Sequence, residues 1–298
     1  IMVASSSRSK RWKLSLIILC LTTCTLFHLY NTSIKASSSA LSFQERIHKE
    51  DALSQARYIT FGTSVTWGSG FDTDEERLNG AYPYLLHGRS VSNVAIRASG
   101  AAYPSLCAET LTNHDDDNDN DEAYDVIVLE FFRWFKKEPS AFLVLIKRLR
   151  HRYPNAILIF LQDWHPRLFV TNDAESGQRL DAREWSIRHK YGEDPNSPLF
   201  KEQFKKENVD KWHCMFDLEE FTIEYEALAR SVGGYVVQLP RPSSLHEVAE
   251  YMHFFSHDWM HLSYQGHALV ASLIRDLVSD IGIVPNPTVN PWKYHDSC

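Results

Sequence analysis

Short apolar runs alternate with amphipathic segments along most of the chain. Runs of β-branched and aromatic residues predict strands at 57–61, 91–96, 125–131, 156–161 and 234–239. Helical periodicity and capping residues predict helices at 82–87, 140–153, 216–231 and from Ser263 to about Gly282. The runs at 125–131 and 156–161 are apolar almost throughout, which is typical of strands covered on both faces. We therefore expect a three-layer α/β/α domain with a mostly parallel central sheet.

The N-terminal region combines a basic cluster with a long apolar segment. Arg8, Lys10, Arg11 and Lys13 precede residues 14–30, a stretch of 17 residues without Asp, Glu, Lys or Arg. As a helix, a segment of this length approaches the thickness of the bilayer's hydrocarbon core, roughly 30 Å. An uncleaved signal anchor fits the length, and a cleaved signal peptide is the alternative. Both place the rest of the chain in the secretory lumen or outside the cell, with the basic flank in the cytosol.

One folded domain is expected to account for most of the chain. The hydrophobic share of 44% and the charged share of 23% exclude a disordered protein, and no internal repeat is visible. The expected organisation is a cytoplasmic N-terminus (1–13), a transmembrane anchor (14–30), a stem (31–50), a domain (51–285) with insertions at 113–122 and 165–213, and a C-terminal tail (286–298).

Charge and cysteine usage narrow the classes of partner and cofactor. A net charge of −7 and a pI of about 6.1 provide no basic field for nucleic acid. Five cysteines are too few for a disulfide scaffold, and none stands with Cys or His at zinc spacing. The acidic run 115–122 lacks the glycine and terminal glutamate of a calcium-binding loop, so we interpret it as a solvated loop. No metal and no organic cofactor is expected.

Three segments that follow predicted strands carry candidate chemistry, because ligands of parallel sheets bind at the carboxyl ends of the strands. Residues 62–68 (GTSVTWG) present Ser64 at a helix N-terminus, where free N–H groups favour an oxyanion. The second segment ends at Gly100, where the backbone can approach a ligand closely. The third places Asp258 three residues before His261, so the carboxylate can hold one imidazole nitrogen and leave the other facing a nucleophile. Each segment can instead simply cap its helix.

In this order, the three segments resemble the blocks of the SGNH (GDSL-like) hydrolase superfamily over nearly the whole domain. Thr63 stands where the first block usually has Asp, and Gly100 matches the glycine of the second block. The last block, Asp-x-x-His, falls on Asp258 and His261. The resemblance implies a flavodoxin-like fold and a serine hydrolase with Ser64 as nucleophile, His261 as base and Asp258 as its partner. It also implies that the N–H groups of Ser64 and Gly100 hold the oxyanion.

The third block departs from the family pattern. The superfamily usually supplies an Asn there, whose side chain donates to the oxyanion, but no Asn occurs from 121 to 154. Trp134 stands at the expected position, and Arg133 beside it is a candidate substitute donor. Losing one oxyanion donor typically costs about 10²–10³ in turnover, so the site is either a slow enzyme or inactive. Five side chains are candidates to line the cleft: Thr63, Arg133, Trp134, Asp163 and Trp164.

The functional expectation is a lumenal or extracellular serine ester hydrolase of the carboxylesterase or acetylesterase type. Its substrate is expected to be a small ester or an acylated carbohydrate. One alternative is a weak or inactive carbohydrate-binding protein on the same scaffold, which the missing Asn favours. Another is an O-acyltransferase that uses the same triad. His267, within the last helix, is expected to be a histidine packed in the core.

Overall fold

The computed structural model describes residues 50–112, 124–164, 169–172, 179–180, 198, 216–241, 247, 251–256 and 258–283. Contacts divide the chain into Ile1–Glu50 and Asp51–Cys298, and apart from Glu50 the described residues belong to the second unit. The predicted anchor, the stem up to residue 49, the acidic run, most of the second insertion and the C-terminal tail lie outside the described residues. Within the described ranges, no helix is both long and apolar enough to cross a bilayer.

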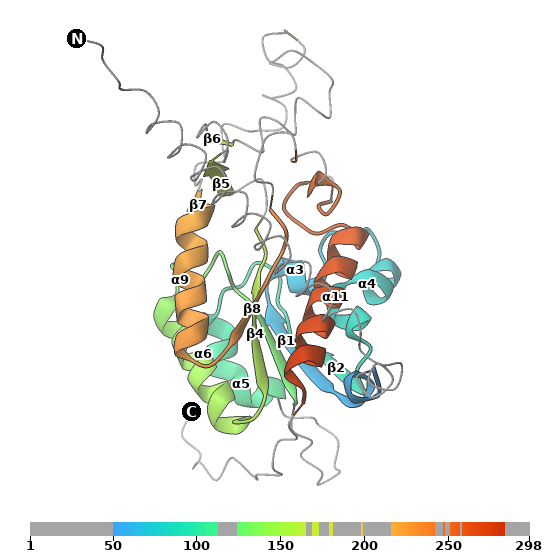
Figure 1. Cartoon of the computed structure of the whole chain (residues 1–298), viewed down its shortest axis with the longest axis vertical. Helices are drawn as coiled ribbons and strands as arrows, with labels where there is room; N and C mark the ends of the chain where they lie inside the picture. The colour runs from blue at the N-terminus through green and yellow to red at the C-terminus, as the bar shows by residue number, and fades with distance from the viewer. Residues whose placement is uncertain are drawn as a thin grey trace, which may run out of the picture. The chain divides into compact units, whose positions relative to one another are not determined.

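A parallel sheet forms the centre of the domain, with its described strands in the order β2-β1-β3-β4-β8 (Figure 1). The strands are β1 (Arg57–Gly62), β2 (Ser90–Asn93), β3 (Val126–Glu130), β4 (Ile157–Gln162) and β8 (Tyr235–Gln238). β3 and β4 are buried along their whole length, as their apolar sequences predict. Ile127 pairs with Ile59 on one side and with Leu158 on the other. Because every neighbouring pair is parallel, the carboxyl ends of the strands lie along one edge.

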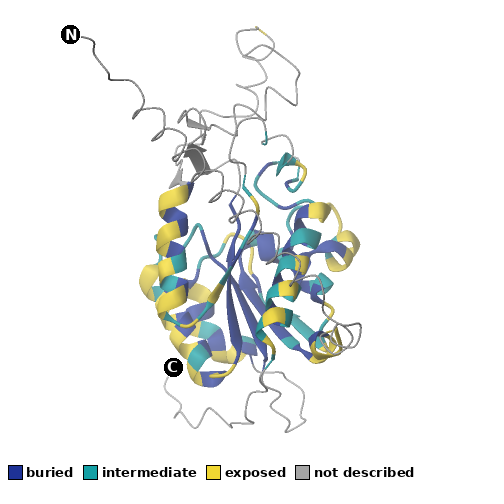
Figure 2. Cartoon of the chain, in the orientation of Figure 1, coloured by how far each residue is buried: buried dark blue, intermediate teal, exposed yellow. Residues whose placement is uncertain are grey.

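Helices cover both faces of the sheet, which confirms the predicted three-layer α/β/α architecture (Figure 1). On one face lie α5 (Ala102–Thr112), α6 (Pro139–Arg152) and α9 (Leu218–Ser231). On the other lie α3 (Ser64–Trp67), α4 (Asp74–Gly80), the 3-10 helix η1 (Tyr82–Leu86) and α11 (Tyr264–Ile281). The three inner strands β1, β3 and β4 are buried almost throughout, and the edge strands β2 and β8 are buried only in part. Many exposed residues lie on the outer sides of the helices (Figure 2). A smaller sheet, β6-β5-β7, contains β5 (Phe169–Asn172), β6 (Arg179–Leu180) and β7 (Phe216–Asp217).

The sequence-based prediction makes β2 too long and omits α4 and α5. β2 ends at Asn93 rather than at 96, because the chain leaves the regular ladder while Ile96 N–H still donates to the Gly62 carbonyl (3.2 Å). The prediction omits α4, although the sequence carries its start signal. Thr73 Oγ1 accepts from the N–H of Glu76 (3.1 Å), and Glu76 Oε2 accepts from the N–H of Thr73 (3.2 Å). This reciprocal capping box begins the helix.

α11 begins and ends where its capping residues predict. Ser263 Oγ accepts from the N–H of Gly266 (3.2 Å), and Gly282 follows the last turn with a φ of 80°. His267 is completely buried, as predicted, and its Nδ1 accepts from the N–H of Tyr82 (3.2 Å). Its ring stacks on Phe71, with centroids 5.1 Å apart. Burial lowers the pKa of His267 to about 3, so the ring is neutral.

Candidate active site

The turn between β1 and α3 carries the candidate nucleophile, Ser64. β1 ends at Gly62, and α3 is a single helical turn that begins at Ser64. A Cβ at Gly62 would lie 2.8 Å from Glu130 Oε2 and would overlap Thr66 Oγ1, so only glycine fits between strand and helix. The two middle residues of α3 are buried, which leaves Ser64 and Trp67 on its half-exposed side.

Ser64, His261 and Asp258 form one chain of hydrogen bonds. Ser64 Oγ lies 2.9 Å from His261 Nε2, and His261 Nδ1 lies 2.6 Å from Asp258 Oδ2. Asp258 Oδ1 accepts hydrogen bonds from the Ser256 hydroxyl (2.7 Å) and from the N–H groups of Met260 (2.9 Å) and His261 (3.0 Å). Partial burial raises the pKa of Asp258, but these hydrogen bonds outweigh burial and hold the pKa well below its usual range. The ionised carboxylate keeps the proton of His261 on Nδ1, so Nε2 can accept from Ser64.

A tight loop holds the acid and the base together. Phe255 and Leu262 form an antiparallel bridge at the base of the loop. Trp259 has a φ of 53°, in the left-handed region that few non-glycine residues adopt. The loop packs closely against the segment after α3, because a Cβ at Gly70 would collide with the Leu262 carbonyl oxygen. This close approach holds His261 beside the turn of the nucleophile.

The buried carboxylate of Glu130 caps α3 from the neighbouring strand. Glu130 ends β3, and its oxygens accept from the backbone N–H groups of Thr63 (2.8 Å) and Thr66 (3.2 Å). They also accept from the hydroxyls of Thr63 (3.0 Å) and Thr66 (3.1 Å). The N–H of Ser64 is left without an acceptor among the described residues. Sequence reasoning missed Glu130, and its signal is a charged residue that ends an otherwise apolar strand.

A second buried carboxyl group, Asp163, lies beside Glu130. Burial and the charge of Glu130 raise the pKa of Asp163 well above its usual range, and Arg133 opposes this only in part. Neither oxygen of Asp163 finds a donor among the described residues. In its neutral form, Asp163 can donate a hydrogen bond to Glu130, which gives both buried carboxyl groups a hydrogen-bond partner. The raised pKa therefore favours the neutral form of Asp163 beneath the turn of the nucleophile.

Arg133 is the side chain that the third block brings to Ser64. Its Nη2 lies 3.1 Å from Thr63 Oγ1 and 3.4 Å from Ser64 Oγ. Trp134 makes no such contact, since its indole N–H is buried without an acceptor among the described residues and Lys137 Nζ lies 4.9 Å from its ring. Buried phenylalanines on either side anchor this segment: Phe131, Phe132 and Phe135. A positive charge thus stands close to the nucleophilic oxygen, in the region where the family usually places an Asn.

Among the described residues, no hydrogen bond links Gly100 to Ser64 or His261. The three atoms nearest to a Cβ built at Gly100 all belong to the carboxyl group of Glu138, which caps α5 by accepting from the N–H of Ala102 (2.9 Å). A carboxylate beside Gly100 would oppose a negative charge on an oxyanion held by its N–H. The role of Gly100 as an oxyanion donor therefore stays a prediction.

Three of the five predicted cleft residues are buried instead. Thr63 has no exposed surface, and Asp163 and Trp164 are 2% and 3% exposed. Trp164 is a core residue, because its indole N–H donates to the Pro240 carbonyl (2.8 Å) and its ring packs edge-on against Phe255. Thr63 and Asp163 lie beneath the nucleophile turn rather than on an open surface. Only Arg133 and Trp134 of this set are half-exposed.

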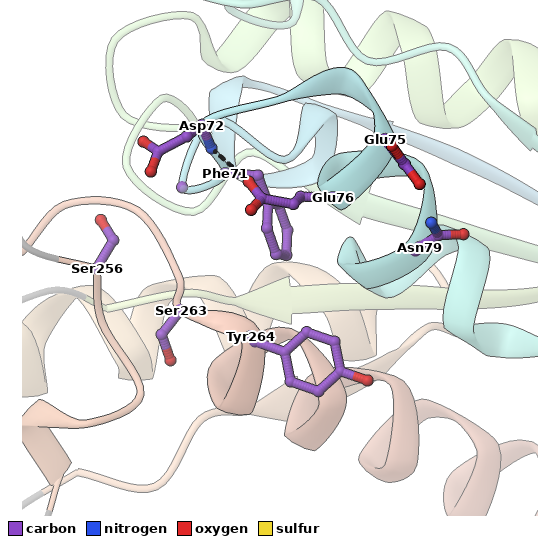
Figure 3. Close-up of a pocket in the computed structure, with 9 residues that line it drawn as sticks. Phe71, Asp72, Glu75, Glu76, Asn79, Ser256, Ser263 and Tyr264 are labelled. Carbon is purple, nitrogen blue, oxygen red and sulfur yellow. Dashed lines mark hydrogen bonds between the residues drawn. The ribbon is translucent and has the colours of Figure 1, made fainter.

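A pocket of about 560 Å³ lies beside the acid of the hydrogen-bond chain (Figure 3). Its lining includes Asp72, Glu75 and Asn79 on one side and Ser256 and Tyr264 on the other. Neither Ser64 nor His261 lines it, so it adjoins the candidate site without containing the nucleophile. Among the described residues, no group of His, Cys, Asp and Glu side chains could hold a metal ion.

No protein-family model matches the chain, and no curated protein is significantly similar to it. Solved structures do match. A candidate SGNH hydrolase from Slackia heliotrinireducens is 16% identical, covering 74% of this chain and 98% of its own, with a TM-score of 0.42. A lipase from a goat rumen metagenome is 12% identical (74% and 97% covered, TM-score 0.39). A carbohydrate esterase family 2 enzyme with a carbohydrate-binding domain, from Corynascus thermopiles (Myceliophthora fergusii), is 13% identical (76% and 66% covered, TM-score 0.44). Several of the solved structures to which the chain is similar are thus described as SGNH hydrolases, lipases or carbohydrate esterases.

Proposed function

We propose that the domain is a serine ester hydrolase with Ser64 as its nucleophile. The observation that carries this proposal is the hydrogen-bond chain from Ser64 Oγ through His261 to an ionised Asp258. A serine hydroxyl is a weak nucleophile by itself, and it becomes effective when an oriented base takes its proton. Mutual capping of the last helix does not account for the third member, because Ser64 lies far away in the sequence, on the turn after β1.

In the proposed reaction, Ser64 Oγ attacks the ester carbonyl carbon while His261 Nε2 takes the hydroxyl proton. A tetrahedral oxyanion forms, and Asp258 stabilises the imidazolium. His261 returns the proton to the leaving alkoxide as the C–O bond breaks, which leaves an acyl group on Ser64. Water then attacks the acyl group with His261 again as base, which releases the carboxylic acid and restores the serine.

Two groups of this chain are proposed to stabilise the oxyanion. The N–H of Ser64 lies at the start of α3 and has no acceptor among the described residues. The Arg133 guanidinium stands 3.4 Å from Ser64 Oγ and can supply a charge-assisted hydrogen bond. Arg133 would then replace the donor that the third block lacks, which favours an active enzyme over an inactive one.

The substrate is proposed to be a small acyl ester, with an acylated carbohydrate as the preferred class. The apolar segment 14–30 and its basic flank support a domain anchored in a membrane and located in the secretory lumen or outside the cell. An O-acyltransferase would use the same first step and differ only in the acceptor, an alcohol in place of water. A non-catalytic carbohydrate-binding protein remains the second candidate, and the Glu138 carboxylate against Gly100 favours it.

Hydrolysis of 4-nitrophenyl acetate by the full-length chain tests the proposal. We expect Ser64→Ala and His261→Ala each to reduce turnover to background, without additivity, because the two residues act as a unit. Ser231→Ala is the matched control, since this serine is exposed at the end of α9 and donates only to the Leu228 carbonyl. An inactive wild-type protein, or a Ser64→Ala variant that keeps the wild-type rate, would contradict the hydrolase proposal.

A further inference from the structure

A second pocket, of about 280 Å³, lies on the nucleophile's side of α3. Its volume is slightly below the roughly 300 Å³ at which ligand pockets usually begin. Trp67 lines it and shares the half-exposed side of α3 with Ser64, three residues earlier. Ser69 also lines the pocket, and its N–H donates to the Ser64 carbonyl (2.9 Å). Ser64 does not itself line the pocket, but a group bound here would lie beside the helical turn that carries it.

Two arginines converge on the ring of Trp67. The guanidinium carbon of Arg77 lies 4.3 Å from the ring centroid, and that of Arg97 lies 4.9 Å from it. Gly68 makes this arrangement possible, because its φ of +92° and a Cβ only 2.8 Å from Arg77 Cγ leave no room for another residue. The two cations are less than about 10 Å apart, roughly one Debye length at 0.1 M salt, so they repel each other.

The carboxylates that line the pocket neutralise one of the two arginines but not the other. Arg77 is paired, since its Nε lies 3.2 Å from Asp74 Oδ1 and its Nη1 donates to the Tyr84 hydroxyl (3.4 Å). Arg97 is exposed and has neither a hydrogen bond nor an ion pair among the described residues. Asp72 lines the same pocket, and its carboxylate makes no ion pair with Arg97. Among the described residues that line the pocket, Arg97 is thus a cation without an ion pair, and the carboxylate of Asp72 does not neutralise it.

We propose that this pocket binds an anionic group of the substrate, a carboxylate or a sulfate, through Arg97. Arginine presents several N–H donors in a plane that matches either anion, and Trp67 holds the guanidinium in place. Asp72 and Thr73 can take up neighbouring hydroxyl groups. The substrate class is then an acyl ester of an acidic sugar, with its charge next to the ester. The role of the pocket in substrate choice rests on the proposed hydrolase function. The binding of an anion by the pocket does not depend on that function.

Titration calorimetry on the full-length chain tests the binding directly. We expect glucuronate and glucose 6-sulfate to bind about 10-fold or more tightly than glucose, and the tighter of the two identifies the preferred anion. Arg97→Gln should remove the preference. Lys147→Gln, which removes one exposed positive charge on α6, should keep it. Equal binding of the three sugars, no binding of either anion, or an unchanged preference in Arg97→Gln would overturn the inference.

Kinetics separate this inference from the proposed function. For acetylated glucuronate relative to acetylated glucose, we expect Arg97→Gln to lower the ratio of kcat/KM values by about 10-fold. If the wild-type protein binds the anions but hydrolyses neither ester, the proposed hydrolase function fails and the anion pocket stands. If it hydrolyses both esters equally well, the hydrolase proposal stands and the anion pocket fails.

Discussion

Substitutions of Glu130 and Asp163 test whether a proton on Asp163 is shared with Glu130 beneath the nucleophile. We predict that Glu130→Gln destabilises the fold strongly and that Asp163→Asn does not. Glu130 accepts four hydrogen bonds as an anion, and each bond to a charged group contributes about 1.5–3 kcal/mol against about 1 kcal/mol for a neutral one. A glutamine has one acceptor oxygen, and its amide N–H groups would face other donors. We expect a loss of roughly 2–4 kcal/mol in the free energy of unfolding.

Burial and the charge of Glu130 raise the pKa of Asp163 and so favour its neutral form, which asparagine resembles; asparagine should therefore change little. Its amide can donate to Glu130 as the protonated acid does, and the expected cost is about 1 kcal/mol or less. Chemical denaturation of both variants measures the difference. At about 2–4 °C per kcal/mol for a domain of this size, Tm should fall by roughly 5–15 °C in Glu130→Gln. A cost for Asp163→Asn that equals or exceeds that of Glu130→Gln would refute the shared proton.

The same two residues predict how the stability of the fold changes with pH. Because the pKa of Asp163 is raised on folding, the native state binds more protons than the unfolded chain between the ordinary and the raised pKa. The contribution of Asp163 to stability is therefore complete at acidic pH and is lost as the pH rises through the raised pKa. Asp163→Asn should abolish this loss of stability with rising pH, which denaturation over a pH series would detect.

Further predictions concern His267 and the third block. As pH falls from about 6.5 to about 3, His267 should destabilise the fold by about 1.4 kcal/mol per pH unit, because only the unfolded chain binds its proton there. In His267→Gln, the free energy of unfolding should fall less steeply as the pH is lowered. An unchanged pH dependence would refute a buried, neutral His267. Arg133→Ala should lower kcat on aryl acetates by about 10²-fold, whereas Trp134→Asn should change kcat far less. An increase in kcat in Trp134→Asn would show instead that this ring obstructs the substrate.

Local pattern suffices to predict the layers of the fold, and the resemblance to the SGNH blocks indicates which residues form the hydrogen-bond chain. The apolar sequences of β3 and β4 predict that both strands are buried. Ser263 and Gly282 predict where α11 begins and ends. Ser64 and His261 are distant in sequence, but both follow strands or precede helices at one edge of a parallel sheet. The α/β alternation therefore suffices to bring them together.

Contacts across the sheet could not be predicted in the same way. The pairing of Glu130 with Asp163 depends on the adjacency of β3 and β4 and on which side each strand end faces. Trp164 is an aromatic residue after a strand, and nothing local distinguishes a cleft position from the core contact that it makes with Phe255. The approach of Glu138 to Gly100 likewise joins two loops whose relative position follows from the packing of α5 on α6.

The nucleophilic reactivity of Ser64 is tested most directly by covalent labelling. The full-length chain is treated with a fluorophosphonate probe, and the modified peptide is identified by mass spectrometry. If His261 and Asp258 activate Ser64, one adduct forms on Ser64 in the wild-type protein and none forms in Ser64→Ala or His261→Ala. An unlabelled wild-type protein, an adduct on another serine, or undiminished labelling of Ser64 in His261→Ala would contradict the triad.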